Sequence, residues 1–112
     1  MRMTRSADFQ RTLRSGVRIS RPTLVVHAGR APNERILVGV VVSKAVGNAV
    51  TRNRVKRRLR HLVAERVATT PTGTDVVVRG LPRSATSATE LRTDLASAWS
   101  SAVRRLTERS HG

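Results

Sequence analysis

The stretch from Gly47 to His61 constrains the fold of this chain more than any other part of the sequence. Six residues between positions 52 and 60 are Arg or Lys, and the first acid that follows is Glu65. Apolar residues recur at helical spacing in and just beyond this basic stretch, and they fall within one arc of about 140° on a helical wheel. These residues are Val55, Leu59, Leu62, Val63 and Val67. The pattern predicts an amphipathic helix from Thr51, its expected N-cap, to about Ala68, docked on a sheet by its apolar side.

The overall charge indicates what such a helix binds. The net charge is +15, from 22 Lys and Arg against 7 Asp and Glu, and the sequence pI is about 12.0. Self-repulsion of this size destabilises a compact state unless a polyanion screens it, and nucleic acid is the commonest such partner. An acidic membrane surface is a weaker alternative, because the basic helix has no Trp or Phe with which to insert. All but two of the basic residues are Arg, which contacts phosphates bidentately.

Two further helices and a small sheet are expected elsewhere in the chain. One helix runs from a cap at Ser6 to a stop at Gly16, and another follows the capping box of Ser87 and Glu90. The last helix has core positions at helical spacing, and Trp99 is interpreted as a packing anchor. Those positions are Leu91, Leu95, Ala98, Trp99, Ala102, Val103 and Leu106. Strands are predicted over residues 23–28, 36–43 and 75–79.

The connections between the strands are less strongly determined. Breaker residues at 30–34 favour a hairpin between the first two strands. Residues 18–22 are predicted to be an extended lead-in, and residues 44–50 suit either a short third strand or a loop. The order is helix, two or three strands, helix, strand, helix. It predicts one α+β domain over residues 1–112, a two-layer sandwich of helices against a small sheet.

No residues are arranged for catalysis. The seven acids are spread along the chain without a pair spaced for acid–base chemistry or Mg²⁺ binding, Cys is absent, and the three His are scattered. These features argue against a self-contained metal-dependent nuclease. A DNA-reading helix-turn-helix is also disfavoured, because the basic helix follows a strand and a Gly-rich turn.

The basic helix is therefore the main candidate site. Asn53, Lys56, Arg57 and Arg60 form a stripe beside the apolar arc, with further basic residues on its other side. Ordinary solvated helix faces mix positive and negative charges, because opposite charges at i,i+4 stabilise the helix. A face of one sign favours phosphate binding.

The motif in this region is specific enough to suggest a family. Ser43-Lys44, followed by the segment from Gly47 to Arg60, closely resembles the signature of the bacterial ribonuclease P protein component. Arg52-Asn53-Arg54 matches the family's Arg-Asn-Arg motif, with its basic continuation at Lys56, Arg57 and Arg60. The resemblance extends over nearly the whole chain.

The resemblance implies a fold and a function. The family fold has the order α-β-β-β-α-β-α with a left-handed βαβ crossover, against the usual handedness. Its members bind ribonuclease P RNA and precursor tRNA, and that RNA removes the 5′ leader using Mg²⁺ held mainly by RNA and substrate. The resemblance implies a cytoplasmic protein without catalytic residues of its own, and no DNA or membrane partner. A structural RNA-binding protein, such as a ribosome-associated one, remains the alternative, since charge alone would explain it.

The resemblance also assigns site residues. Those expected to bind the RNA subunit are Lys44, Asn48, Arg52, Asn53, Arg54, Lys56, Arg57, Arg58 and Arg60. Those expected in a cleft for the single-stranded leader are Phe9, Leu13, His27, Gly39, Val41 and Ser43. Strand alternation would turn Val38, Val40 and Val42 the other way, toward the helices. With one Phe, one Trp and no Tyr, the cleft is expected to use apolar contact and His27 more than base stacking.

Overall fold

A computed structural model describes residues 16–32 and 34–111 of the chain. The strands are β1 (Val17–Ser20), β2 (Leu24–Arg30), β3 (Ile36–Val42) and β4 (Thr74–Gly80). The long helices are α2 (Ala49–Val67) and α3 (Ala88–His111), and the short 3-10 turns are η1 (Lys44–Val46) and η2 (Pro82–Ala85). The predicted helix from Ser6 to Gly16, with the candidate residues Phe9 and Leu13, lies outside the described residues. The α+β class is confirmed, with two main helices described.

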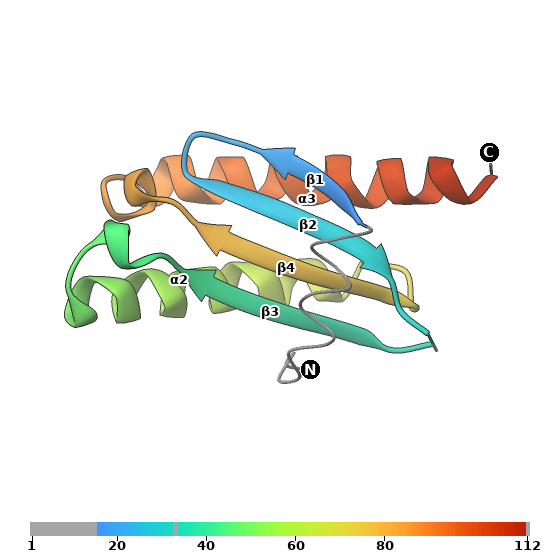
Figure 1. The fold of residues 1–112 in the computed structure, drawn as a ribbon, viewed down its shortest axis with the longest axis horizontal. Helices are drawn as coiled ribbons and strands as arrows, with labels where there is room; N and C mark the ends of the chain where they lie inside the picture. Colours follow the sequence, from blue (N-terminus) through green and yellow to red (C-terminus); the bar gives the residue numbers. More distant parts are fainter. Residues whose placement is uncertain (1–15, 33, 112) are drawn as a thin grey trace.

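The four strands form one mixed sheet in the order β1-β2-β4-β3. β1 pairs antiparallel with β2, and β2 pairs antiparallel with β4. β3 pairs parallel with β4. Both helices lie on the same side of this sheet, with α3 against β1 and β2 and α2 against β3 (Figure 1). The described residues therefore form two layers.

Helix α2 makes the crossover between the parallel strands β3 and β4. In Figure 1 both strands point to the left, β4 lies above β3, and α2 passes behind the sheet. Seen from the helix side with the strands pointing up, the chain moves from right to left. The crossover is therefore left-handed, whereas nearly all crossovers of this kind are right-handed.

One prediction about the strands is wrong, and one open alternative is decided. Residues 30–34 do not make a hairpin, because β4 lies between β2 and β3. The run Val76–Val78 is buried throughout, as expected for a strand in the middle of a sheet. The turn residues at 30–34 do not indicate that β4 occupies that position. Residues 44–50 contain η1 and the start of α2 and form no strand. The third strand that precedes α2 is instead β1, which overlaps the segment predicted as an extended lead-in and begins one residue before it.

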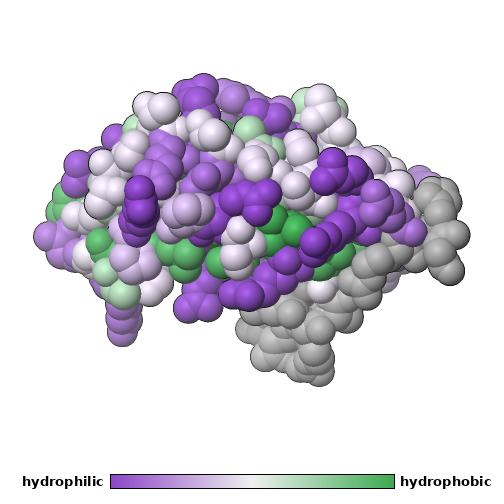
Figure 2. Space-filling view, turned by 90° about the horizontal axis from the view of Figure 1, so that it is seen from above, coloured by the Kyte–Doolittle hydropathy of each residue, from purple (hydrophilic) through white to green (hydrophobic). Residues whose placement is uncertain are grey.

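The core lies between the sheet and the two helices. Its largest fully buried side chains are Leu24, Val26, Val55, Leu59, Val76, Val78, Leu91 and Leu95. Trp99 is 3% exposed, and its indole N–H donates to Thr70 Oγ1 at 2.9 Å, which confirms its role as a packing anchor. Seen edge-on, the surface is mostly hydrophilic, with hydrophobic side chains gathered in a narrow band (Figure 2).

Candidate nucleic-acid interface

The start of α2 is set by Asn48, and Thr51 is not the cap that the sequence predicts. Asn48 has an extended backbone, and its Oδ1 accepts the N–H of Thr51 at 2.9 Å. Gly47 precedes it with φ of 153°, where a side chain is strained, and a Cβ there would lie 3.1 Å from the Thr51 side chain. The glycine turn therefore places the cap three residues earlier than predicted and adds a helical turn before Arg52.

Capping gives Asn48 a structural role that can be separated from RNA binding. We expect Asn48→Ala to lower the free energy of unfolding by about 1 kcal/mol, because the Thr51 N–H loses its acceptor. Asn48→Ser keeps a capping oxygen and is expected to restore most of that stability. Urea unfolding of the three proteins measures both changes. Equal loss in the Ala and Ser variants would contradict the capping role, and weaker RNA binding by the stable Ser variant would reveal an additional RNA contact.

Helix α2 separates an anchoring side from a charged side. Its buried residues are Val55, Leu59, Leu62 and Val63, as predicted, and Val67 is half-buried. The exposed candidates for RNA binding are Lys44 on η1, the cap Asn48, and Asn53, Arg54, Arg57 and Arg60 on the helix. Arg52, Lys56 and Arg58 are half-buried along its flanks. The structure thus brings all nine predicted residues together on α2 and the turn before it.

The charge on α2 is not neutralised within the described part of the chain. None of its Arg or Lys side chains forms an ion pair with another described residue, and its ion pair is His61 with Glu65 at 3.6 Å. The first turn contains no acid to offset the positive end of the helix dipole. The Nε of Arg52 is buried without a hydrogen-bond partner among the described residues. Such a surface attracts anions from solution.

The sheet face opposite the helices carries a second group of candidates. His27 lies directly beside Arg18 on one side and Val77 on the other, and Val77 in turn lies beside Gly39. Burial lowers the pKa of His27 below its ordinary value, and Arg18 and Arg79 lower it further. His27 is therefore neutral near pH 7. It offers a ring for apolar contact and stacking as well as hydrogen bonding.

The remaining cleft candidates divide between this face and its end. Val41, which is 38% exposed, lies beside Arg79 in the next row, so it shares the face with His27 and Gly39. Ser43 lies one residue beyond β3, where its Oγ accepts the N–H of Ala45. Val38 and Val42 are in the core and Val40 packs against it, which confirms the alternation.

Sequence reasoning missed two arginines on this face. Arg18 and Arg79 are both exposed and flank His27. Each alternates with buried neighbours in its strand, which was a signal in the sequence. Their common location could not be inferred without the pairing of β1 and β4 with β2.

Residues 16–32 and 34–111 contain no group of three or more His, Asp or Glu side chains positioned to hold a metal ion. Within the same residues no helix has the length and apolar character needed to span a membrane.

Comparison with known proteins identifies the family. The family model described as Ribonuclease P matches residues 1–103. The ribonuclease P protein component of Kocuria rhizophila is 54% identical over 105 residues, which cover 93% of this chain and 93% of that protein. The chain belongs to the ribonuclease P protein family.

Further relatives and solved structures of this family agree with the fold. The ribonuclease P protein component of Pseudarthrobacter chlorophenolicus is 46% identical over 110 residues, covering 96% of this chain and 81% of that protein. A structure of the Staphylococcus aureus RNase P protein superposes with a TM-score of 0.80 at 25% identity, covering 88% of this chain and 92% of that one. The Thermotoga maritima RNase P protein shares the fold, with a TM-score of 0.73 at 22% identity and coverage of 87% and 93%. As a ribonuclease P protein component, this chain belongs to a tRNA-processing ribonucleoprotein, which implies association with the ribonuclease P RNA.

Proposed function

We propose that this protein binds ribonuclease P RNA through the charged side of α2 and the 5′ leader of precursor tRNA through the sheet face opposite the helices. The RNA subunit then cleaves the leader with Mg²⁺. The observation that carries the proposal is the basic surface of α2, whose Arg and Lys side chains form no ion pair with a described residue and which a buried apolar side fixes to the sheet.

The arrangement of α2 suits a structured RNA. Its Arg and Lys side chains follow the helix from Arg52 to Arg60 and offer several separate phosphate contacts. Each contact releases counterions, so affinity should fall steeply with salt. Arginine can also hold a phosphate through two parallel N–H groups, and the exposed Arg54, Arg57 and Arg60 can offer such pairs.

The sheet face opposite the helices suits a single strand. His27 and Val41 provide a ring and apolar contact, and Arg18 and Arg79 provide charge beside them, whereas Gly39 in the same row is buried. A single strand exposes its bases and phosphates together, so a face that combines both kinds of contact can hold it without reading its sequence. The neutral state of His27 favours ring contact with a base over a phosphate contact.

The chemistry is assigned to the RNA. The described residues have no carboxylate cluster to hold Mg²⁺, so the proposal places the metal on RNA and substrate phosphates. The protein contributes by binding and orienting the leader beside the cleavage site. Its basic side chains also lower the repulsion between two polyanions, which reduces the Mg²⁺ needed for their association.

Reconstitution tests the proposal. Ribonuclease P RNA and precursor tRNA are combined at low Mg²⁺ with and without the protein, and cleavage of the 5′ leader is measured. We expect the protein to raise the cleavage rate, and a substrate whose leader is cut to one nucleotide to benefit less. No increase would contradict the function, and leader cleavage by the protein without any RNA subunit would contradict catalysis by the RNA.

A further inference from the structure

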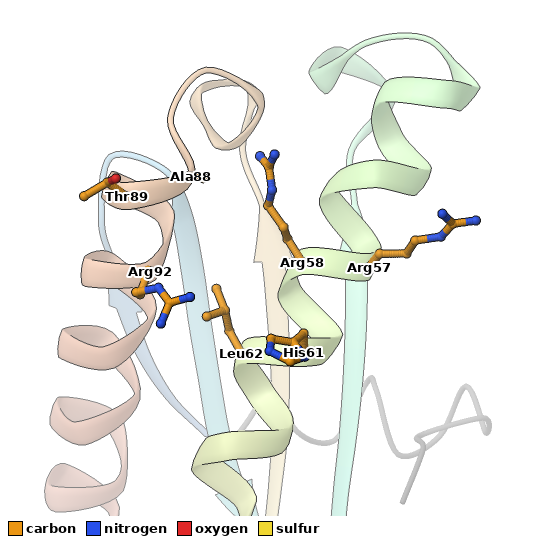
Figure 3. Close-up of a pocket in the computed structure, with 7 residues that line it drawn as sticks. All are labelled: Arg57, Arg58, His61, Leu62, Ala88, Thr89 and Arg92. Carbon is orange, nitrogen blue, oxygen red and sulfur yellow. The ribbon is translucent and has the colours of Figure 1, made fainter.

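A groove between α2 and α3 borders the charged side of α2 and includes residues of α3 that no site above contains. It has a volume of about 490 Å³ and is open to solvent (Figure 3). Its lining residues are Arg57, Arg58, His61 and Leu62 from α2 and Ala88, Thr89 and Arg92 from α3. The groove lies on the helix layer, and the sheet face with His27 is on the opposite side of the sheet.

Two arginines from different helices extend into the gap. Arg58 extends from α2 into the space between the helices, and Arg92 extends from α3 toward Leu62 and His61 (Figure 3). Arg57 points away from α3, so it belongs to the outer side of α2. The 7% exposed Leu62 forms an apolar floor between them. The guanidinium groups of Arg58 and Arg92 therefore line the same groove.

Nothing in the described chain neutralises this pair. No acid lines the groove, and neither Arg58 nor Arg92 forms an ion pair with a described residue. Glu90, two residues before Arg92, is held instead by Arg83, whose Nε lies 2.9 Å from its Oε1. Two guanidinium groups facing one cavity without a counter-charge repel each other, and an anion bound there would remove that cost.

The first turn of α3 adds to the attraction for an anion. Ser87 caps the helix, and its Oγ accepts the N–H of Glu90 at 3.1 Å. Ala88 and Thr89, at the positive end of this 24-residue helix, line the same groove. The dipole therefore reinforces the charge that Arg58 and Arg92 supply.

We propose that this groove binds a backbone phosphate of the RNA partner between Arg58 and Arg92, which extends the RNA interface from α2 onto α3. The proposal deepens the function proposed above and rests on it for the identity of the RNA. Arg58 belongs both to the basic motif of α2 and to the lining of the groove, so it connects the two surfaces. Arg92 is then an RNA-binding residue that the basic motif does not include. An RNA strand would thus contact two helices, which fixes its orientation more firmly than one helix can.

The test compares two arginines of the same helix. Arg92→Ala is expected to weaken binding of ribonuclease P RNA about tenfold, the usual loss for one charge-assisted hydrogen-bonded contact. Arg104→Ala is the matched control, since it removes the same charge from an exposed position about 18 Å further along α3. Its effect at 0.15 M salt is expected to be about twofold or less, because distant charges are screened. Circular dichroism confirms that both exposed variants fold.

A double-mutant cycle tests whether one phosphate contacts both arginines. If Arg58 and Arg92 hold the same group, the loss in Arg58→Ala/Arg92→Ala is smaller than the product of the two single losses. Independent contacts would multiply, which would overturn the shared site. Equal affinities of Arg92→Ala and Arg104→Ala would overturn the groove as an RNA contact.

A second RNA separates this proposal from the function itself. Each protein is also measured with a fragment of ribosomal RNA of similar length. If the wild type binds only the ribosomal fragment and Arg92→Ala weakens that binding, the proposed function fails while the groove stands. If the wild type binds ribonuclease P RNA and Arg92→Ala matches its control, the groove fails while the function stands. If the wild type binds neither RNA, both are overturned.

Discussion

Replacing Arg57 and Arg60 together by Ala is expected to weaken binding of ribonuclease P RNA by roughly 100-fold, about tenfold for each phosphate contact. Both side chains are exposed on the charged side of α2, and neither is paired with a described acid. Their loss therefore leaves the fold intact and removes only contacts with the partner.

The salt dependence of the same variant gives a second measurement. The logarithm of the binding constant is plotted against the logarithm of salt concentration, and each lost phosphate contact lowers its slope by roughly 0.7 to 0.9. Arg57→Ala/Arg60→Ala should thus lower the slope by about 1.4 to 1.8. The control is Arg104→Ala/Arg105→Ala, which removes two exposed charges from the far part of α3. A slope equal to that of the wild type would remove Arg57 and Arg60 from the interface.

The charged helix could be predicted in detail because its two sides are encoded locally. The apolar positions from Val55 to Val63 follow the helical period, and all are buried as expected. The cap was missed by three residues because Thr51 and Asn48 both suit a cap by residue type. The choice between them depends on the backbone at Gly47, which has φ of 153°.

Strand pairing was less accessible from the sequence. The turn signals at 30–34 report a change of direction and carry no information on which strand becomes the neighbour. Placing β4 between β2 and β3 depends on α2 returning the chain to the middle of the sheet. The short β1 was missed as a strand because its pattern is only four residues long, and its pairing with β2 supplies most of its definition.

The same limit explains which site residues were found. The candidates on α2 are neighbours in sequence, so a helical wheel assembles them. Arg92 lines the same groove as Arg58 only because α3 packs beside α2, and Arg18 lies beside His27 only because β1 pairs with β2. Motif reasoning assembles residues within one element, and the packing of elements adds those contributed from elsewhere.

Replacing Leu59 by Ala is expected to have the largest effect on stability. Leu59 is fully buried on the anchoring side of α2. Its Cδ1 packs against Gly80 on β4 and lies 3.4 Å from the point that a Cβ would occupy there. Removing a buried Leu side chain costs about 2 to 5 kcal/mol through lost burial and the cavity left behind. That is a large part of the roughly 5 to 15 kcal/mol that stabilises a domain. The urea midpoint should fall with little change in the unfolding slope.

Val50→Ala is the matched control, because Val50 lies on the same helix but is 72% exposed. Its effect is expected to stay within about 0.5 kcal/mol, as for most surface substitutions. Equal urea midpoints for the two variants would contradict the anchoring role of Leu59.

The RNA affinity of both variants is also measured, under conditions where both are folded. It should be that of the wild type, since the charged side of α2 is unchanged. Leu59→Ala should keep the salt slope of the wild type while losing stability, the reverse of the result for Arg57→Ala/Arg60→Ala. A lowered slope in Leu59→Ala would instead show that the two sides of α2 act together and that RNA binding depends on how the helix is seated.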